Sequence, residues 1–206
     1  MMIQTDLKLL EDILKGNRKE ICCVYGEPAS GKTTLVKEAA IFQSKNGKKV
    51  VFIDSEKTFN TDRLMQLCGN KKEILKNIFV LKPKNLKEQR KYLKKLLKLK
   101  DLDLVIIDSV GFFHRYELKK DSVNANKELH KQCNILSELC SKGTAVMITN
   151  QVYEDIENKK INLVGGSMLK NWSKCLLKLE KNPRKLILEK PRNKEVAFKI
   201  IKEGLV

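Results

Sequence analysis

Residues 21–34, ICCVYGEPASGKTT, constrain the fold more than any other stretch of the chain. An apolar, partly β-branched run ends in a phosphate-loop pattern, and a helical register opens at Lys32. Gly26 and Gly31 permit a tight turn whose backbone N–H groups, with the N-terminus of the next helix, point at one anionic centre. Lys32 would bring a positive charge to the β- and γ-phosphates, and the Thr33 hydroxyl could ligate Mg²⁺. The sequence therefore predicts a strand, a phosphate loop and a helix; the alternative is a glycine-rich turn without a ligand.

Length and composition favour a single soluble domain over residues 1–206. The longest apolar runs fall well short of the roughly 20 residues that span a membrane, so we expect no membrane association. The first residues, MMIQTDLKLLEDILKG, mix charged and apolar side chains, unlike a secretory signal, so we expect a cytoplasmic protein. The six cysteines include no CxxC pair, which argues against zinc and favours buried thiols in a reducing compartment.

The formal net charge of +17 is the second global signal. The chain has 42 basic and 25 acidic residues, and this excess of positive charge favours a polyanionic partner, most simply nucleic acid. The alternative is a lysine-rich composition that reflects the proteome or adaptation to heat, in which Lys and Glu rise together. Glu has not risen in step here, so we expect nucleic-acid binding.

The chain then alternates apolar runs and helical patterns, as expected of a mostly parallel sheet. Helices are predicted over residues 5–15, 33–45 and, after Pro83, within 82–100, with a strand over 49–54. Glu56 directly follows that strand, where α/β proteins place ligands, and is a candidate general base or an ordinary loop carboxylate. Arg63 could stack on a base or face solvent. The lysines of 82–100 could form a solvated helix face or bind phosphate.

The second half of the chain supplies further candidates. The strand 104–108, LVIID, has the form of a Walker B element, in which Asp108 would hold Mg²⁺. Residues 109–120 are interpreted as a loop that meets nucleic acid, or else as a helix packed on the sheet. A helix to about Ser141 and a strand over 144–150 follow, and Gln151 could sense the γ-phosphate or cap the strand. Residues 152–166 are predicted to be a mobile loop, and 175–179, 185–189 and 196–201 an antiparallel extension of the sheet.

These motifs resemble the RecA-type recombinase superfamily and, within it, most closely the archaeal RadB family of short recombinase paralogues. The resemblance rests on GEPASGKTT (26–34), VFIDSEKTFNTDRL (51–64), LVIIDSV (104–110) and ITNQVYED with LVGGSMLKNWS (148–155 and 163–173). It covers essentially the whole chain. It implies a P-loop NTPase with a RecA-like α/β core, in which helices cover a mostly parallel central sheet and an antiparallel β extension lies at the C-terminal end.

The resemblance also implies roles for individual residues, with ATP and Mg²⁺ as cofactors. The expected nucleotide-binding residues are Gly26, Glu27, Pro28, Ala29, Ser30, Gly31, Lys32, Thr33, Thr34 and Arg63. Glu56 and Gln151 would be catalytic, and Thr33 and Asp108 would hold the metal. The expected DNA contacts, on two loops, are His114, Arg115, Lys119, Lys120, Lys159 and Lys160. Lys190 and Arg192 resemble the paired basic residues that such proteins present to a neighbour's γ-phosphate.

Three departures from the full-length recombinases limit the expected activity. The chain begins almost at the ATPase core, Lys57 stands where they have Gly after the catalytic Glu, and the second loop is short. We therefore expect a weak, DNA-dependent ATPase that assists homologous recombination and DNA repair with little strand exchange of its own. Single-stranded DNA, the main recombinase and a Holliday junction resolvase are the implied partners, and the chain could form a homo-oligomer.

Two other classes of function remain open from the sequence. A KaiC-like signalling ATPase would switch protein partners without touching DNA, and its charge would be compositional. A small-molecule kinase would use the same fold but needs an acceptor pocket and an Arg-rich lid, neither of which the sequence indicates.

Overall fold

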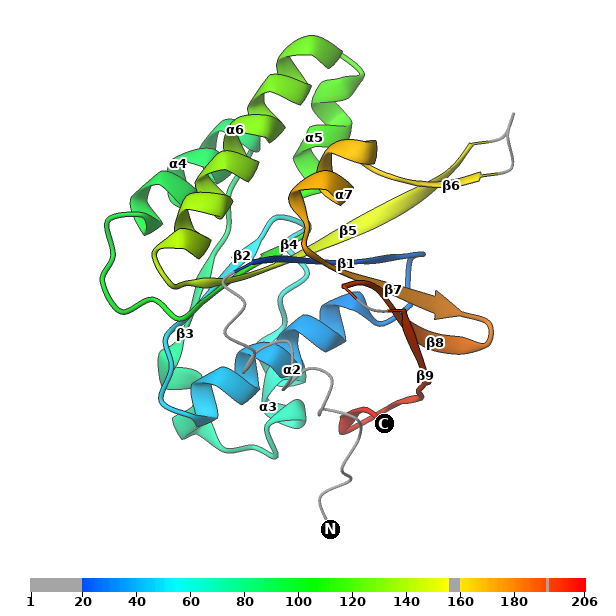
Figure 1. Cartoon of the computed structure of the whole chain (residues 1–206). Coiled ribbons are helices and arrows are strands. Elements are labelled where there is room, and N and C mark those ends of the chain that lie inside the picture. Colours follow the sequence, from blue (N-terminus) through cyan, green and yellow to red (C-terminus); the bar gives the residue numbers. More distant parts are fainter. Residues whose placement is uncertain (1–19, 156–159, 192) are drawn as a thin grey trace.

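The computed structural model describes residues 20–155, 160–191 and 193–206 (Figure 1). The helix predicted over residues 5–15 lies outside the described residues. The elements are β1 (Ile21–Gly26), α2 (Lys32–Lys45), β2 (Val50–Asp54), α3 (Thr61–Leu67), the 3₁₀ helix η1 (Lys72–Asn77), β3 (Ile78–Leu81), α4 (Leu86–Leu96), β4 (Leu104–Asp108), α5 (Gly111–Leu118), α6 (Ser122–Ser141), β5 (Ala145–Asp155), β6 (Lys160–Leu163), α7 (Gly166–Trp172), β7 (Cys175–Lys181), β8 (Arg184–Lys190), β9 (Lys194–Ala197), β10 (Ile200–Ile201) and β11 (Gly204–Leu205).

A central sheet in the order β3-β2-β4-β5-β1-β7-β8-β9 organises the described chain. Every neighbouring pair from β3 to β7 is parallel, and β8 and β9 continue the sheet in antiparallel fashion. The predicted α/β class, the mostly parallel sheet and the C-terminal antiparallel extension are thus confirmed. One detail differs, because β7 pairs with β1 in parallel. The helix α7, which the sequence did not reveal, returns the chain to the edge where β1 begins.

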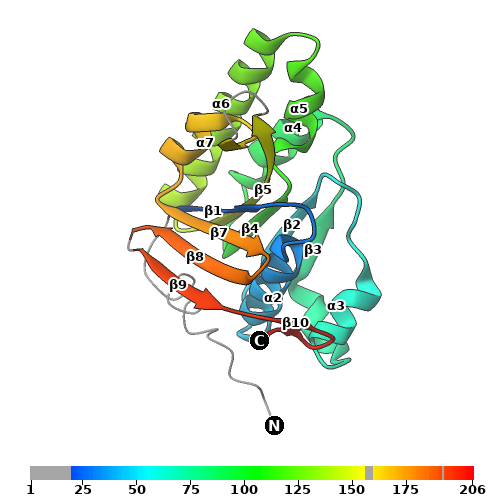
Figure 2. The same ribbon diagram turned by 90° about the vertical axis from the view of Figure 1, so that its right-hand side faces the viewer.

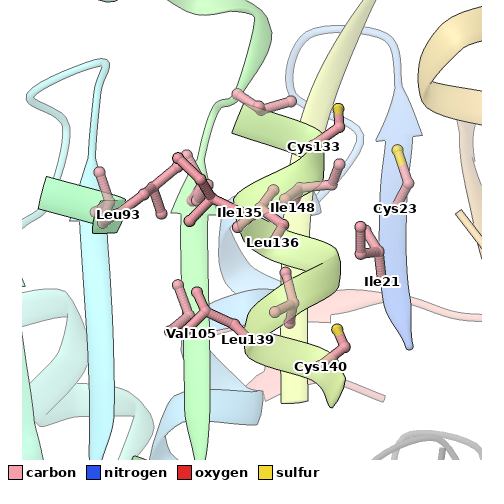
Figure 3. Packing of buried hydrophobic residues seen from close by; sticks show 14 of the residues in the cluster. Ile21, Cys23, Leu93, Val105, Cys133, Ile135, Leu136, Leu139, Cys140 and Ile148 are labelled. Atoms are coloured by element: carbon pink, nitrogen blue, oxygen red, sulfur yellow. The ribbon is translucent and has the colours of Figure 1, made fainter. Parts of the chain in front are cut away.

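Helices cover both faces of this sheet (Figures 1 and 2). On one face α6 packs against β5 and β1, with α4 and α7 as neighbours of α6; on the other, α2 packs against the central strands. Figure 3 shows the first layer, where Leu136 and Leu139 of α6 meet Val105 and Ile148 of the strands. The central strands are buried on both faces, which explains their continuous apolar sequences. All six cysteines are buried free thiols, including the four whose burial the sequence predicted, Cys22, Cys23, Cys133 and Cys140.

Two segments differ from the sequence prediction. Residues 111–118, favoured as a loop, form the helix α5, which packs against α6 and β5. Residues 152–166, predicted as a loop, extend β5 to Asp155 and pair it with β6 in an antiparallel ladder, so Gln151 lies within the strand and not past its end. Packing of side chains fixes the helix α5, and pairing between strands fixes the β5–β6 ladder. Both segments are too short for their sequences to show a helical or strand period. Within the described residues, no helix is long and apolar enough to cross a membrane.

Candidate nucleotide site

The phosphate loop joins β1 to α2, and its backbone requires glycine at the first position. Gly26 has a φ of +155°, and a Cβ atom there would lie 2.2 Å from the carbonyl oxygen of Leu179 on the neighbouring strand β7. Because that oxygen belongs to the backbone of a packed sheet, it cannot move aside cheaply. The loop is therefore held tightly against β7.

Lys32 lies within the curve of this loop. Its Nζ atom donates hydrogen bonds to the carbonyl oxygens of Gly26, at 2.9 Å, and Glu27, at 2.7 Å. Burial lowers the pKa of Lys32, and the nearby carboxylates of Asp108 and Glu56 oppose that shift. A bound phosphate would supply the negative charge that favours the ammonium form. The residue is thus placed to exchange carbonyl partners for phosphate oxygens.

The N-terminus of α2 fits an anionic ligand. No side chain caps this helix end, and no acidic residue lies in its first turn, so the backbone N–H groups are left for another acceptor. The Ser30 hydroxyl is fully buried and has no hydrogen-bond partner among the residues that the structure describes. A phosphate held in the loop would accept hydrogen bonds from both the N–H groups of α2 and the Ser30 hydroxyl. The residues present therefore fit the triphosphate that the sequence pattern predicts.

Thr33 and Asp108 meet beside the loop, as the Walker pattern predicts. The Thr33 hydroxyl donates to Asp108 Oδ2 at 2.9 Å, and the Thr149 hydroxyl donates to Oδ1. Burial raises the pKa of Asp108, and the hydrogen bonds from Thr149 and Thr33 oppose the rise. Among the described residues, no group of three His, Cys, Asp or Glu side chains could hold a metal ion by itself. Mg²⁺ would therefore take most of its ligands from phosphate and water, as it does in nucleotide sites.

Glu56 joins the site through hydrogen bonds to Ser109, directly after β4, and to Gln151 of β5. Its Oε1 atom accepts one from the Ser109 hydroxyl at 2.5 Å and one from Gln151 Nε2 at 3.0 Å. Gln151 Oε1 in turn accepts from Arg115 Nη1 at 3.1 Å. The structure thus brings both predicted catalytic residues, Glu56 and Gln151, into direct contact and links them to α5.

The predicted DNA-binding residues fall in different environments. Arg115, Lys119 and Lys120 are exposed on or after α5. His114, by contrast, is fully buried, and its Nε2 atom lies 3.0 Å from Asn126 Oδ1 of α6. Burial also lowers the pKa of His114, which disfavours the cationic ring. The structure does not place His114 where DNA could reach it, because the helix turns its ring toward α6. Lys159 lies outside the described residues, as does the side chain of Lys160.

Two further predicted residues, Arg63 and Lys190, donate hydrogen bonds to backbone carbonyl groups of the chain itself. Arg63 donates to the carbonyl oxygens of Lys202, at 2.5 Å, and Ile201, at 3.3 Å, which ties α3 to the hairpin β10–β11. The Lys190 ammonium donates to the carbonyl oxygen of Lys170 at 2.8 Å. Arg192 lies outside the described residues. Among the described residues, neither Arg63 nor Lys190 forms a hydrogen bond with Thr33 or Asp108.

Sequence reasoning missed three residues that shape the site. Ser109 and Thr149 orient the two carboxylates, and Arg184 donates to the carbonyl oxygens of Ala29, at 3.3 Å, and Ser30, at 3.4 Å. A polar residue inside an otherwise apolar strand could have indicated Thr149. Nothing in the sequence around Arg184 indicates a contact with a loop some 150 residues away.

Comparisons with known proteins agree with this geometry. The Rad51 family model matches residues 1–205. The chain is 37% identical to the DNA repair and recombination protein RadB of Methanococcus maripaludis strain C7, over 96% of this chain and 97% of that protein. It is 33% identical to the RadB protein of Methanocaldococcus jannaschii, over 96% and 98%. A crystal structure of the RadB recombinase superposes with a TM-score of 0.78 at 30% identity, covering 94% of each chain.

These matches extend over nearly the full length of this chain and of each matched protein, and they include a solved structure that superposes with a TM-score of 0.78. They favour a recombinase paralogue over a KaiC-like ATPase. The resemblance inferred from four motifs is therefore confirmed: the chain belongs to the RadB family of Rad51-type DNA repair and recombination proteins.

Proposed function

We propose that this protein binds ATP with Mg²⁺ and hydrolyses it slowly, with stimulation by DNA, while it assists homologous recombination and DNA repair. One observation carries the proposal. The Glu56 carboxylate, bonded to Gln151, stands with the Thr33–Asp108 pair at the carboxyl ends of adjacent strands, beside the phosphate loop. ATPases of this family use ATP and Mg²⁺, and this arrangement supplies each protein group that such a reaction requires.

Each residue has a distinct role in the proposed reaction. Lys32 and the free N–H groups of α2 would bind phosphate oxygens, and Thr33 and Asp108 would hold Mg²⁺, whose charge would offset that of the phosphates. Glu56 orients the attacking water and accepts its proton as the bond from oxygen to the γ-phosphorus forms and ADP departs. Because Glu56 already accepts two hydrogen bonds on Oε1, its second oxygen is the one positioned for that water.

DNA and protein partners complete the proposal. Arg115, Lys119 and Lys120 lie exposed at α5, and an overall charge of +17 would attract single-stranded DNA. The main recombinase, a Holliday junction resolvase and further copies of this chain are the proposed protein partners. Such a role on DNA corresponds to a cytoplasmic location. Little strand exchange is expected from this chain alone.

Binding and turnover of ATP test the nucleotide site separately. Lys32→Ala should weaken binding of a fluorescent ATP analogue at least tenfold, because a buried cation that faces phosphate is lost. Glu56→Gln should keep that binding and lower the ATPase rate by about 10²-fold or more. If Lys32→Ala bound ATP as tightly as the parent, or Glu56→Gln hydrolysed it at the parent rate, the assignment would be wrong.

DNA binding distinguishes the proposal from a signalling ATPase. A gel shift with single-stranded DNA, and the ATPase rate with and without it, should both show an effect, and affinity should fall steeply with salt. Absence of binding at low salt would exclude the DNA half of the proposal.

A further inference from the structure

The helix α4 divides into an inner face that is fixed and an outer face that is almost entirely lysine. Residues 82–100, KPKNLKEQRKYLKKLLKLK, hold nine basic residues and one acidic residue. On the inner face Leu86, Leu93 and Leu96 are buried in the core. The exposed lysines of α4 and its flanks, which we call the α4 lysine face, are Lys84, Lys87, Lys91, Lys94, Lys95 and Lys98.

Polar contacts lock the inner face in place. Gln89 is fully buried, accepts from the Ser55 hydroxyl at 2.7 Å and donates to Gln132 Oε1 of α6 at 2.8 Å. The half-buried Arg90 lies 2.7 Å from Glu128 Oε2 of α6. These contacts fix the rotation of α4 about its own axis, so the lysines on its other side project away from the core.

The lysine spacing forms one continuous stripe. Lys87, Lys91 and Lys94 follow at intervals of four and three residues, which places them on one side of α4; Lys95 lies beside them, and Lys98 follows just past the helix end. With a rise of 1.5 Å per residue, Lys87 to Lys95 covers roughly 12 Å. Duplex DNA carries about one negative charge per 1.7 Å of its axis, so several phosphates lie within this length.

Most of these lysines form no ion pair with a described acidic residue. No ion pair in the described part of the chain involves Lys91, Lys94, Lys95 or Lys98, whereas lysines elsewhere, such as Lys131 and Lys142, pair with Glu128 and Glu138. The single acidic residue on the outer face, Glu88, accepts hydrogen bonds from the Lys84 backbone N–H and the Tyr92 hydroxyl. Four neighbouring ammonium groups without an ion pair repel one another, and a polyanion relieves that repulsion.

We propose that the α4 lysine face binds the sugar-phosphate backbone of duplex DNA, on a different helix from the DNA contacts proposed for α5. The two helices are neighbours: α4 contacts both α5 and α6, and Figure 2 shows α4 beside α5. The face favours duplex over single strands because it is a row of lysines with one aromatic residue, the half-buried Tyr92, whereas proteins that bind single strands stack successive bases on several aromatic rings. Lysines on a convex helix contact phosphates without reading sequence.

A matched pair of triple variants tests this site in the full-length chain. Lys91/Lys94/Lys98→Gln and Lys71/Lys72/Lys76→Gln each remove three exposed lysines and lower the formal charge from +17 to +14. Fluorescence anisotropy with a labelled duplex of mixed sequence, across a salt series, gives the affinity and its salt slope. We expect the α4 triple to bind roughly tenfold or more weakly at moderate salt, with a log–log slope less negative by about 2 to 3. The η1 control should stay within twofold of the parent.

A charge-conserving variant and a folding control distinguish a local binding site from a general effect of charge. Lys91/Lys94/Lys98→Arg keeps the charges and should retain parental affinity, and thermal unfolding checks that each triple remains folded. Equal losses in both Gln triples would overturn the proposal, since charge alone would then govern binding. Unchanged duplex binding in the α4 triple would also overturn it, and would direct the search to an acidic protein partner. ATP binding and stimulation by single-stranded DNA should persist in the α4 triple, so failure of this site is distinguishable from failure of the proposed function.

Discussion

Gln151 Nε2 donates a 3.0 Å hydrogen bond to Glu56 Oε1, although the two residues stand 95 positions apart in the chain. The same side chain accepts a 3.1 Å hydrogen bond from Arg115, so a surface residue of α5 is two hydrogen bonds from the proposed general base. An amide can serve both contacts only if its oxygen faces Arg115 and its nitrogen faces Glu56. Anything that moves Arg115 therefore acts on the orientation of Gln151 and, through it, on Glu56.

Arg115→Ala should lower the DNA-stimulated ATPase rate about three- to tenfold, because Gln151 loses the contact that fixes its orientation. Arg115 is exposed, so the energetic effect is modest. Measuring kcat with saturating DNA removes any contribution from weaker DNA binding. The same substitution in a Gln151→Ala background should have little further effect on kcat. Fully additive losses would show that Arg115 acts on the rate without Gln151.

The phosphate loop and the Walker B strand were predictable because their chemistry is local. Gly26 to Thr33 form one turn and one helix start, and the apolar run that ends in Asp108 marks a buried parallel strand. Their meeting also follows from topology, since the carboxyl ends of parallel strands share one edge of the sheet. The sequence therefore predicted the Thr33–Asp108 pair, which the structure joins at 2.9 Å.

Other parts of the site depend on contacts that no local pattern encodes. The Ser109 hydroxyl reaches Glu56 because β4 and β2 are neighbours with Asp108 opposite Asp54, a register that only the folded sheet defines. Arg184 likewise contacts the phosphate loop from β8, a contact that depends on where the folded sheet places β8. The turning of His114 toward α6 depends on which face of α5 packs inward, and eight residues are too few to reveal that face.

Gly26→Ala should destabilise the protein by about 2–3 kcal/mol or more and abolish binding of an ATP analogue. The new Cβ would lie 2.2 Å from the Leu179 carbonyl oxygen, so the loop or β7 must shift. Gly47→Ala is the matched control, because Gly47 also has a positive φ, +74°, but a Cβ there meets no atom within 4 Å. The control should cost about 1 kcal/mol and leave nucleotide affinity unchanged. Urea unfolding and fluorescence titration measure the two effects, and equal losses of affinity would contradict the explanation.

Glu38→Gln should make the protein more stable at pH 8 and leave it nearly unchanged near pH 4.5. Burial raises the pKa of Glu38 to about 7, although the Leu205 backbone N–H and the Arg63 charge oppose the rise. The folded state therefore holds the proton more tightly than the unfolded chain, whose carboxyl titrates near 4.5, and stability falls as pH rises between these values. Gln keeps the acceptor for the Leu205 N–H, at 2.6 Å from Oε1 in the parent, without the cost of ionisation.

The expected gain in the free energy of unfolding at pH 8 is on the order of 1–3 kcal/mol. Urea unfolding at pH 5, 6, 7 and 8 gives the difference between variant and parent, which should grow across this range. Glu73→Gln, at an exposed position of η1, serves as the control and should show no such trend. A difference that stays constant with pH would exclude Glu38 as the titrating group.

Lys57→Gly should leave stability within about 0.5 kcal/mol of the parent, whereas Lys57→Val should lose about 1–2 kcal/mol. Lys57 is exposed and has a φ of +58°, a left-handed conformation that glycine adopts freely and β-branched residues resist. Glycine relieves this strain but loosens the unfolded chain by a similar amount, so its two effects nearly cancel. Lys71→Val, at an exposed position with a φ of −85°, is the control and should be nearly neutral. Midpoints of urea unfolding measure all three, and a Lys57→Val variant as stable as Lys71→Val would show that this turn carries no strain.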